Sequence, residues 1–285
     1  MVGLHSFRPS SDTRFAIEDG ALSAIAPHSP SQSQLLAALP PEDYERLLPK
    51  LEPVALSLGW TVHRAGDQEK HLYFLTAGIV SRFYVTENGA STEFAVTGRE
   101  GVVGVASFLG GDSTLSQAVV LSPGYAYRLR ADLLKDEFER DGSLSRLLLR
   151  YTLALIAQTG QIAGCNRHHS LKQQLCRWIL SCLDRLPSNE LTMTQELIAE
   201  MLGVRREAVT LAAGKLQDAG VICCRRGHIA VLDRPKLEAQ ACECYAVIRR
   251  AYDRLLCPKN TINNVRARQV SPLLHRLSET SVSLR

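Results

Sequence analysis

The stretch TQELIAEMLGVRREAVTLAAGKLQDAG, residues Thr194–Gly220, decides the fold of this chain. Its apolar spacing predicts two short helices joined by a tight turn. Ala199 is small enough to let the helices approach, Gly203 tolerates the positive φ of the turn, and β-branched Val209 anchors the second helix. The second helix opens on three charged residues: Arg205, Arg206 and Glu207. In a helix-turn-helix this end enters the major groove of DNA, and the two signals together favour that motif over an ordinary helical hairpin of an enzyme.

A basic hairpin is predicted directly after this stretch. Two short apolar runs, Val221–Cys224 and Ile229–Leu232, are joined by Arg225-Arg226-Gly227-His228. A hairpin with a basic tip after a recognition helix is a wing, and its cations suit contact with phosphates. Pro235 then predicts the start of a last helix, which runs to about Leu256.

A long helix is predicted before the DNA-binding motif. Asp141 or Ser143 can cap it, and it runs to about His169. Its residues follow alternating spacings of four and three, which form a heptad seam: Leu144, Leu148, Tyr151, Leu155, Gln158, Ile162 and Cys165. We expect these residues, up to Ile162, to meet the same helix of a second subunit, with Gln158 fixing the register. The alternative is that the helix packs only on its own domain.

The first half of the chain has the pattern of a small β domain. Short alternating runs are separated by turn signals over residues 52–130, which indicates a β-sandwich or a small jelly roll. The runs are Pro53–Leu58, His71–Thr76, Ile79–Thr86, Ser91–Val96, Ser116–Val120 and Tyr125–Arg130. Asn88-Gly89 suits a two-residue hairpin, and Ala77-Gly78 and Pro123-Gly124 are predicted as further turns.

Composition sets the broad class. Hydrophobic residues make up 45% of the 285 and charged residues 22%, as in a soluble globular protein, and the net charge of +4 is too small to indicate DNA by itself. No apolar run is long enough to cross a bilayer, and Met1–Ser33 has no secretory signal pattern. We therefore expect a cytoplasmic protein without a membrane partner.

The layout resembles the Crp–Fnr superfamily of bacterial transcription regulators, from about Leu35 to Leu232. Two stretches carry the resemblance: Gly66-Asp67 with LYFLTAGIV at Leu72–Val80, and GVRREAV at Gly203–Val209. It implies an α+β fold with an N-terminal antiparallel, jelly-roll-like β-roll, a long dimerisation helix and a C-terminal winged helix-turn-helix. The expected parts are a flexible arm (1–33), a cyclic-nucleotide-binding-like sensor domain (34–142), the dimerisation helix (143–169), the DNA-binding domain (170–257) and a flexible tail (258–285).

The resemblance also implies which residues read DNA. Arg206 and Glu207 match the family's base-reading pair, since a guanidinium can grip guanine O6 and N7 and a carboxylate can accept from cytosine N4. Leu211 stands where the best-known member has a second arginine, so the operator is expected to differ. The expected DNA-binding set is Thr194, Gln195, Arg205, Arg206, Glu207, Thr210, Lys215, Arg225 and Arg226. The alternative for Arg205 and Arg206 is a solvated helix end.

The expected partners follow from this reading. A homodimer would read double-stranded DNA at an inverted repeat, and RNA polymerase would be a further partner of an activator. The stretch Gly101–Gln117 lacks the glutamate and the arginine with which relatives bind cyclic AMP, because Gly104 stands near the glutamate position and no arginine follows. We therefore expect a different, unidentified effector, rather than a cyclic-nucleotide-responsive module that serves another protein.

The histidines and cysteines do not predict a cofactor. An iron–sulfur cluster needs cysteines that the sensor half lacks, and His63 and His71 are not expected to bind haem. The remaining sets are Cys165 with His168 and His169, Cys223-Cys224 with His228, and Cys242 with Cys244. None has the spacing of a structural zinc site, so packing is expected and no metal. The alternative is a redox- or metal-responsive regulator that uses these cysteines, with Cys223-Cys224 made reactive by the adjacent arginines.

An enzyme is not expected. The closest enzyme reading is a cupin-like β-barrel, which needs a close His-x-His followed by glutamate and histidine. His63 and His71 are too far apart for that set, and no nucleophile elbow or phosphate loop is present in the sequence.

Overall fold

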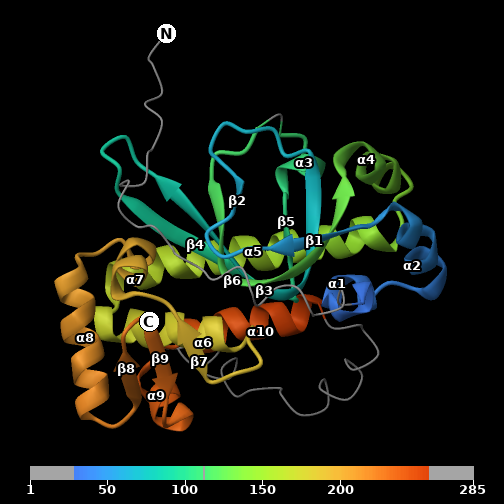
Figure 1. Ribbon diagram of the computed structural model, residues 1–285. Helices are drawn as coiled ribbons and strands as arrows, with labels where there is room; N and C mark the ends of the chain where they lie inside the picture. The colour runs from blue at the N-terminus through green and yellow to red at the C-terminus, as the bar shows by residue number, and fades with distance from the viewer. Residues whose placement is uncertain (1–28, 112, 257–285) are drawn as a thin grey trace, which may run out of the picture.

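The computed structural model describes residues 29–111 and 113–256 (Figure 1). The predicted arm and tail therefore lie outside the described residues, except for residues 29–33 of the arm. A β-roll forms one half of the molecule, the winged helix-turn-helix forms the other, and the long helix α5 runs along both (Figure 1). The expected fold class is confirmed.

The roll is an antiparallel sheet with the strand order β1–β6–β3–β4, in which β2 also pairs with β6 and β5 with β3. The strands are β1 Glu52–Leu56, β2 Thr61–His63, β3 His71–Val85, β4 Ser91–Thr97, β5 Val102–Val103 and β6 Gln117–Arg130. Short helical segments surround it: η1 Pro30–Gln32, α1 Gln34–Ala37, α2 Pro41–Leu47, η2 Leu48–Lys50, α3 Ala106–Leu109 and α4 Ala131–Glu139.

Two of the predicted turns are wrong. Gly78 lies inside the continuous strand β3, and Gly124 lies inside β6, so each expected pair of short strands is one long strand. The register shifts here, and a Cβ at Gly124 would lie 2.2 Å from the carbonyl oxygen of Ala77. The glycines thus let two backbones approach closely where the strands bend, which curls the sheet instead of ending it.

The helix α5, Ser143–His168, buries its heptad seam inside its own chain. Tyr151 donates to the carbonyl of Val102 at 2.9 Å, and Tyr252 donates to Gln158 Oε1 at 2.6 Å. No seam side chain predicted for the dimer interface is more than 7% exposed in the single chain: Leu144, Leu148, Tyr151, Leu155, Gln158 and Ile162. Their assignment to a subunit interface is therefore wrong, because the roll and the last helix already cover them.

The second half contains α6 Leu171–Leu183, β7 Glu190–Thr192, α7 Gln195–Leu202, α8 Arg206–Asp218, β8 Ile222–Arg225, β9 His228–Val231, α9 Arg234–Gln240 and α10 Cys244–Leu256. The predicted last helix is thus two helices, with a break at residues 241–243. After the break, α10 lies along α5 (Figure 1). Its Ile248 and Tyr252 belong to one buried cluster with residues of α5 and α1. Burial of this apolar face against α5 accounts for the change of direction.

The roll and the winged helix share one apolar core. Ile79, Phe83 and Val96 of the roll belong to the same buried cluster as Trp178 of α6 and Ile198 of α7. Polar contacts cross the same boundary: Trp178 Nε1 donates to Glu93 Oε1 at 2.9 Å, and Ser91 Oγ donates to the carbonyl of Glu200 at 3.1 Å. The winged-helix half is therefore held against strand β4. Among the described helices, none combines the length and the apolar character of a membrane span.

Candidate nucleic-acid interface

The helix-turn-helix forms as its sequence predicts. Thr194 caps α7, since its side chain accepts from the backbone N–H of Leu197 at 3.2 Å. Gly203 ends α7 at a φ of 66°, which favours glycine, and the small Ala199 and the branched Val209 are buried between the helices. The turn therefore fixes the direction in which α8 leaves the body of the protein.

The opening of α8 is exposed to solvent. Arg205 is its N-cap residue, and Arg205, Arg206 and Glu207 are all exposed. Within residues 29–111 and 113–256, the Arg206 guanidinium forms a long surface ion pair with Glu196, 3.7 Å between Nε and Oε2. Such a pair is weak in water, so the guanidinium is free to exchange it for a nucleic-acid partner.

Three elements meet around one hollow beside this opening. The hollow has a volume of about 420 Å³ and lies between the start of α7, the start of α8 and the wing. It brings together residues of the predicted DNA-binding set: Thr194, Gln195, Arg206, Arg225 and Arg226. Exposed cations and hydroxyls that converge from separate elements suit contact with a run of phosphates.

The other predicted DNA-binding residues surround the hollow or lie further along α8. Thr210 donates to Gln195 Oε1 at 2.7 Å and so joins α8 to α7. Lys215 is exposed near the end of α8, away from the hollow. Leu211 is also exposed on α8, where an apolar side chain can contact a thymine methyl group.

His228 was not in the predicted set, yet it lines the same hollow at the tip of the wing. Its position in the basic Arg225–His228 connection could have indicated this, but the sequence analysis assigns phosphate contact only to the two arginines.

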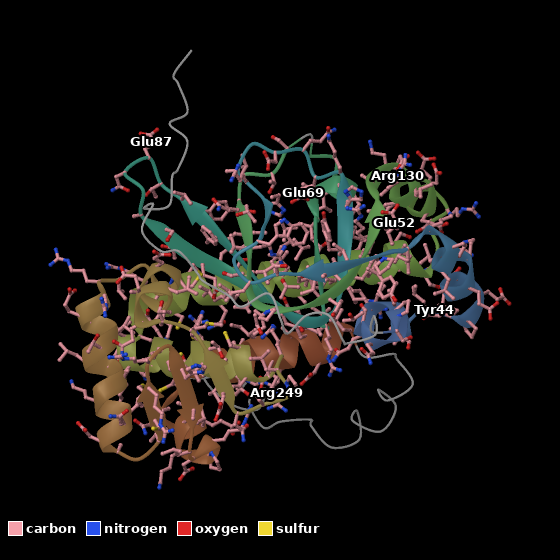
Figure 2. The ribbon with its side chains drawn as sticks, in the orientation of Figure 1. Tyr44, Glu52, Glu69, Glu87, Arg130 and Arg249 are labelled. Atoms are coloured by element: carbon pink, nitrogen blue, oxygen red, sulfur yellow. The ribbon has the colours of Figure 1, made fainter. Side chains whose placement is uncertain are left out.

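The interior of the roll contains buried polar groups. Glu69 Oε2 accepts from the backbone N–H of Ala106, the first residue of α3, at 2.7 Å (Figure 2). His63 Nδ1 lies 3.4 Å from Glu69 Oε1. Burial raises the pKa of Glu69, and burial followed by the charge of Arg82 lowers the pKa of His63 to about 4. His63 is therefore neutral near pH 7.

Arg82 lies fully inside the roll. Its Nη2 donates to Thr97 Oγ1 and to the hydroxyl of Tyr151, both at 3.1 Å. Gly104 closes the roll from another side: a Cβ there would lie 2.3 Å from the carbonyl oxygen of His71. No side chain fits at Gly104 without a shift of the backbone.

Among the described cysteines, Cys176 and Cys182 are buried in the core around α6, and the other five form two groups. Cys223 and Cys224 are half-buried on β8, and burial, followed by the charge of Cys223, raises the pKa of Cys224. This shift is opposite to the one that activates a redox thiol, so it does not favour a redox role for Cys224. Cys165, Cys242 and Cys244 form a separate buried cluster, which the sequence pattern had left as unrelated sets.

A helix-turn-helix with a basic wing, joined to a β-roll by a long helix, defines a winged-helix DNA-binding regulator with a sensor-type domain. Comparison with known families agrees: a Crp-like helix-turn-helix domain matches residues 173–240, and a cyclic nucleotide-binding domain matches residues 53–141. Together they cover more than half of the chain, which belongs to the Crp–Fnr superfamily of transcription regulators. The prediction that it is not an enzyme is confirmed by this family.

Individual relatives are distant. The global nitrogen regulator of Synechococcus elongatus is 25% identical over 191 residues, or 64% of this chain and 86% of that protein. FixK2 of Bradyrhizobium japonicum has a TM-score of 0.59 at 15% identity, with coverage of 67% of this chain and 98% of that one. A CRP-family transcriptional regulator of Thermus thermophilus has a TM-score of 0.56 at 19% identity, with coverage of 66% and 96%. At these identities the solved structures establish the fold alone.

Proposed function

We propose that this transcription regulator acts as a homodimer that reads an inverted-repeat DNA site and responds to an effector other than cyclic AMP. The observation that carries the DNA-reading part is the exposed hollow in which Arg206 of the recognition helix meets Arg225 and Arg226 of the wing. Thr194 and the wing arginines would fix the register on phosphates, and Arg206 and Glu207 would read base edges.

The dimer would form through a face of α5 that the heptad pattern did not include. Leu149, Leu153 and Ile156 are 49%, 52% and 62% exposed, and they lie four and three residues apart on one side of the helix. Gly160 and Gly164 continue this side and are exposed as well, which would let two helices approach closely. A second copy of α5 is the occupant we propose, since dimeric regulators place two recognition helices in successive major grooves.

The proposal that cyclic AMP is not the effector rests on the roll interior. Glu69 already accepts from the N-terminal amide of α3, and a carboxylate there would repel a phosphate. Arg82, a buried cation of the roll, lies outside the Gly101–Gln117 stretch, and its Nη2 already donates to Thr97 and Tyr151. A glutamate at Gly104 would collide with the backbone at His71. The Gly101–Gln117 stretch therefore offers a buried cyclic phosphate no cation of its own.

Selection of bound DNA from a random pool tests the DNA part directly. We expect enrichment of sequences with two inverted half-sites whose centres are about one helical turn apart. Equal binding of selected and shuffled DNA at the same salt concentration would refute sequence-specific reading. Enrichment of single half-sites would refute the dimeric arrangement.

Calorimetry tests the effector part separately. Titration with cyclic AMP and cyclic GMP is expected to give no binding heat. A saturable isotherm with either nucleotide would overturn this part and leave the DNA-reading part intact.

A further inference from the structure

Four metal-ligating side chains meet at the far end of α5. Cys165 lies in the last turn of α5 and His169 follows the helix end, so the two are four residues apart and share one side. Cys242 lies in the break between α9 and α10, and Cys244 begins α10. One ligand atom from each of the four residues lies within 4.8 Å of all the others.

The spacing of these atoms fits a tetrahedral metal centre. Cys165 Sγ lies 3.5 Å from Cys242 Sγ, and Cys244 Sγ lies 3.4 Å from His169 Nδ1. Zinc bonds of about 2.3 Å to sulfur and about 2.0 Å to nitrogen place tetrahedral ligands roughly 3.5–3.8 Å apart. These two pairs therefore need only small adjustments to surround an ion.

The groups around the cluster are those that a histidine–thiolate centre requires. His169 turns Nδ1 towards Cys244, and its Nε2 lies 3.3 Å from Glu243 Oε1. A carboxylate behind a ligating histidine fixes the ring and its tautomer. Gln161 Nε2 donates to Cys244 Sγ at 3.1 Å, as an amide can donate to a thiolate. The three sulfurs are buried, and His169 is partly exposed.

A buried cation balances the charge that such a centre would carry. Three thiolates and one divalent ion sum to a charge of −1. Arg177 is buried beside Cys165, and its Nε has no hydrogen-bond partner within the described part of the chain. A buried guanidinium with an unsatisfied N–H is costly, and a nearby anion offsets that cost.

We propose that one zinc ion is bound here as a structural ion by four side chains: Cys165, His169, Cys242 and Cys244. Three sulfurs and one imidazole nitrogen in a closed tetrahedron form a donor set that selects zinc. Each coordinating thiol releases its proton to solvent when the ion binds. The break between α9 and α10, which contains neither glycine nor proline, presents the two cysteines to the end of α5. The ion ties the winged helix to α5 and holds α10 in place.

Metal content of the full chain tests the proposal without DNA, so its failure would leave the proposed function untouched. The protein is purified with a reductant and with zinc in the growth medium, and its metal is measured by mass spectrometry. We expect one zinc ion per chain, and cobalt substitution should give the intense visible absorption of a tetrahedral thiolate site. A zinc-free protein, or one with a Cys165–Cys242 disulfide under these conditions, would overturn the proposal.

Variants locate the ion. Cys223→Ser, on the wing, is the matched control and should keep one zinc per chain, whereas Cys244→Ser should lose the cobalt absorption of a three-sulfur site. Glu243 is 69% exposed, so Glu243→Gln should fold normally and weaken zinc binding about 10- to 100-fold in a chelator competition. Unchanged zinc affinity in both Glu243→Gln and His169→Gln, or loss of zinc in Cys223→Ser alone, would overturn the assignment.

Discussion

Arg206 is exposed at the start of α8, and its ion pair with Glu196 is long and at the surface. Removal of its side chain is therefore expected to leave the fold intact, so a change in DNA binding would report on the Arg206 contact itself. We predict that Arg206→Ala weakens binding to the selected operator by about 1–3 kcal/mol, or roughly 5- to 150-fold, and relaxes the base preference at one position of each half-site. Fluorescence anisotropy with the operator and its single-base variants measures both effects.

Arg140→Ala is the matched control for this prediction. Arg140 is an exposed arginine at the end of α4, remote from the wing and α8, and its removal should leave operator affinity unchanged. Equal losses in the two variants would mean that Arg206 contributes only general positive charge.

Glu93 is a buried carboxyl at the boundary between the roll and the winged helix. It accepts from Ser81 Oγ at 2.5 Å and from Trp178 at 2.9 Å, and burial raises its pKa from 4.5 to about 7. The folded state therefore holds the proton more tightly than the unfolded state. It follows that the contribution of Glu93 to stability is greatest at low pH and falls as the pH rises from about 4.5 to 7.

We predict that Glu93→Gln, which mimics the protonated carboxyl, raises the free energy of unfolding at pH 8 by at most about 3 kcal/mol and changes it little at pH 4.5. Denaturant unfolding at the two pH values measures the difference. Glu87→Gln, at the exposed tip of the hairpin between β3 and β4 (Figure 2), is the control and should have the same small effect at both. A lower free energy of unfolding for Glu93→Gln at pH 8 would contradict the raised pKa of Glu93.

At the scale of elements, local sequence patterns predicted where helices and strands form but not which surfaces they pack against. The helix-turn-helix followed from small and branched residues a few positions apart, which act within the motif. The heptad pattern of α5 predicted the helix correctly but assigned its apolar face to a second subunit, whereas the chain itself covers that face. A periodic apolar face does not specify which surface packs against it. The turns predicted at Gly78 and Gly124 failed for the same reason: a contact across the sheet, absent from the local sequence, determines the role of each glycine.

The exposed side of α5 leads to a prediction for the dimer. Leu153→Glu places a charge at the centre of this side, where burial against a second copy would be costly. We expect the particle mass to fall from twice the chain mass of 31.4 kDa to that of one chain in light scattering. Leu115→Glu, at an exposed leucine of the roll, should remain dimeric. A dimer that survives Leu153→Glu would exclude this side as the interface.

At the scale of the molecule, sites built from residues far apart in the chain could not be predicted from the sequence. The wing, α7 and α8 could be foreseen as one DNA-reading surface, because they are close in the chain and in a known order. Cys165 and Cys242 are 77 residues apart and meet only because α10 turns back along α5. The same turn covers Gln158 with Tyr252 and so removes the heptad seam from the surface.

The shared core predicts cooperative unfolding of the two halves. Trp178 lies in the core that joins the winged helix to the roll, and Trp60 packs on the roll alone. We expect Trp60→Phe and Trp178→Phe, each with one tryptophan left, to unfold in a single transition, with a lower midpoint for Trp178→Phe because it removes a buried indole and its bond to Glu93. Circular dichroism of each variant should follow its fluorescence. Two separate transitions would show that the halves unfold independently.

The contact between strand β4 and the helix-turn-helix also limits how this regulator could be recombined. Fusion of residues 170–256 to an unrelated sensor domain would expose Trp178 and Ile198 to solvent. It would also leave the indole N–H of Trp178 without its acceptor, Glu93. A functional chimera would therefore need a replacement for strand β4 in addition to the winged-helix domain.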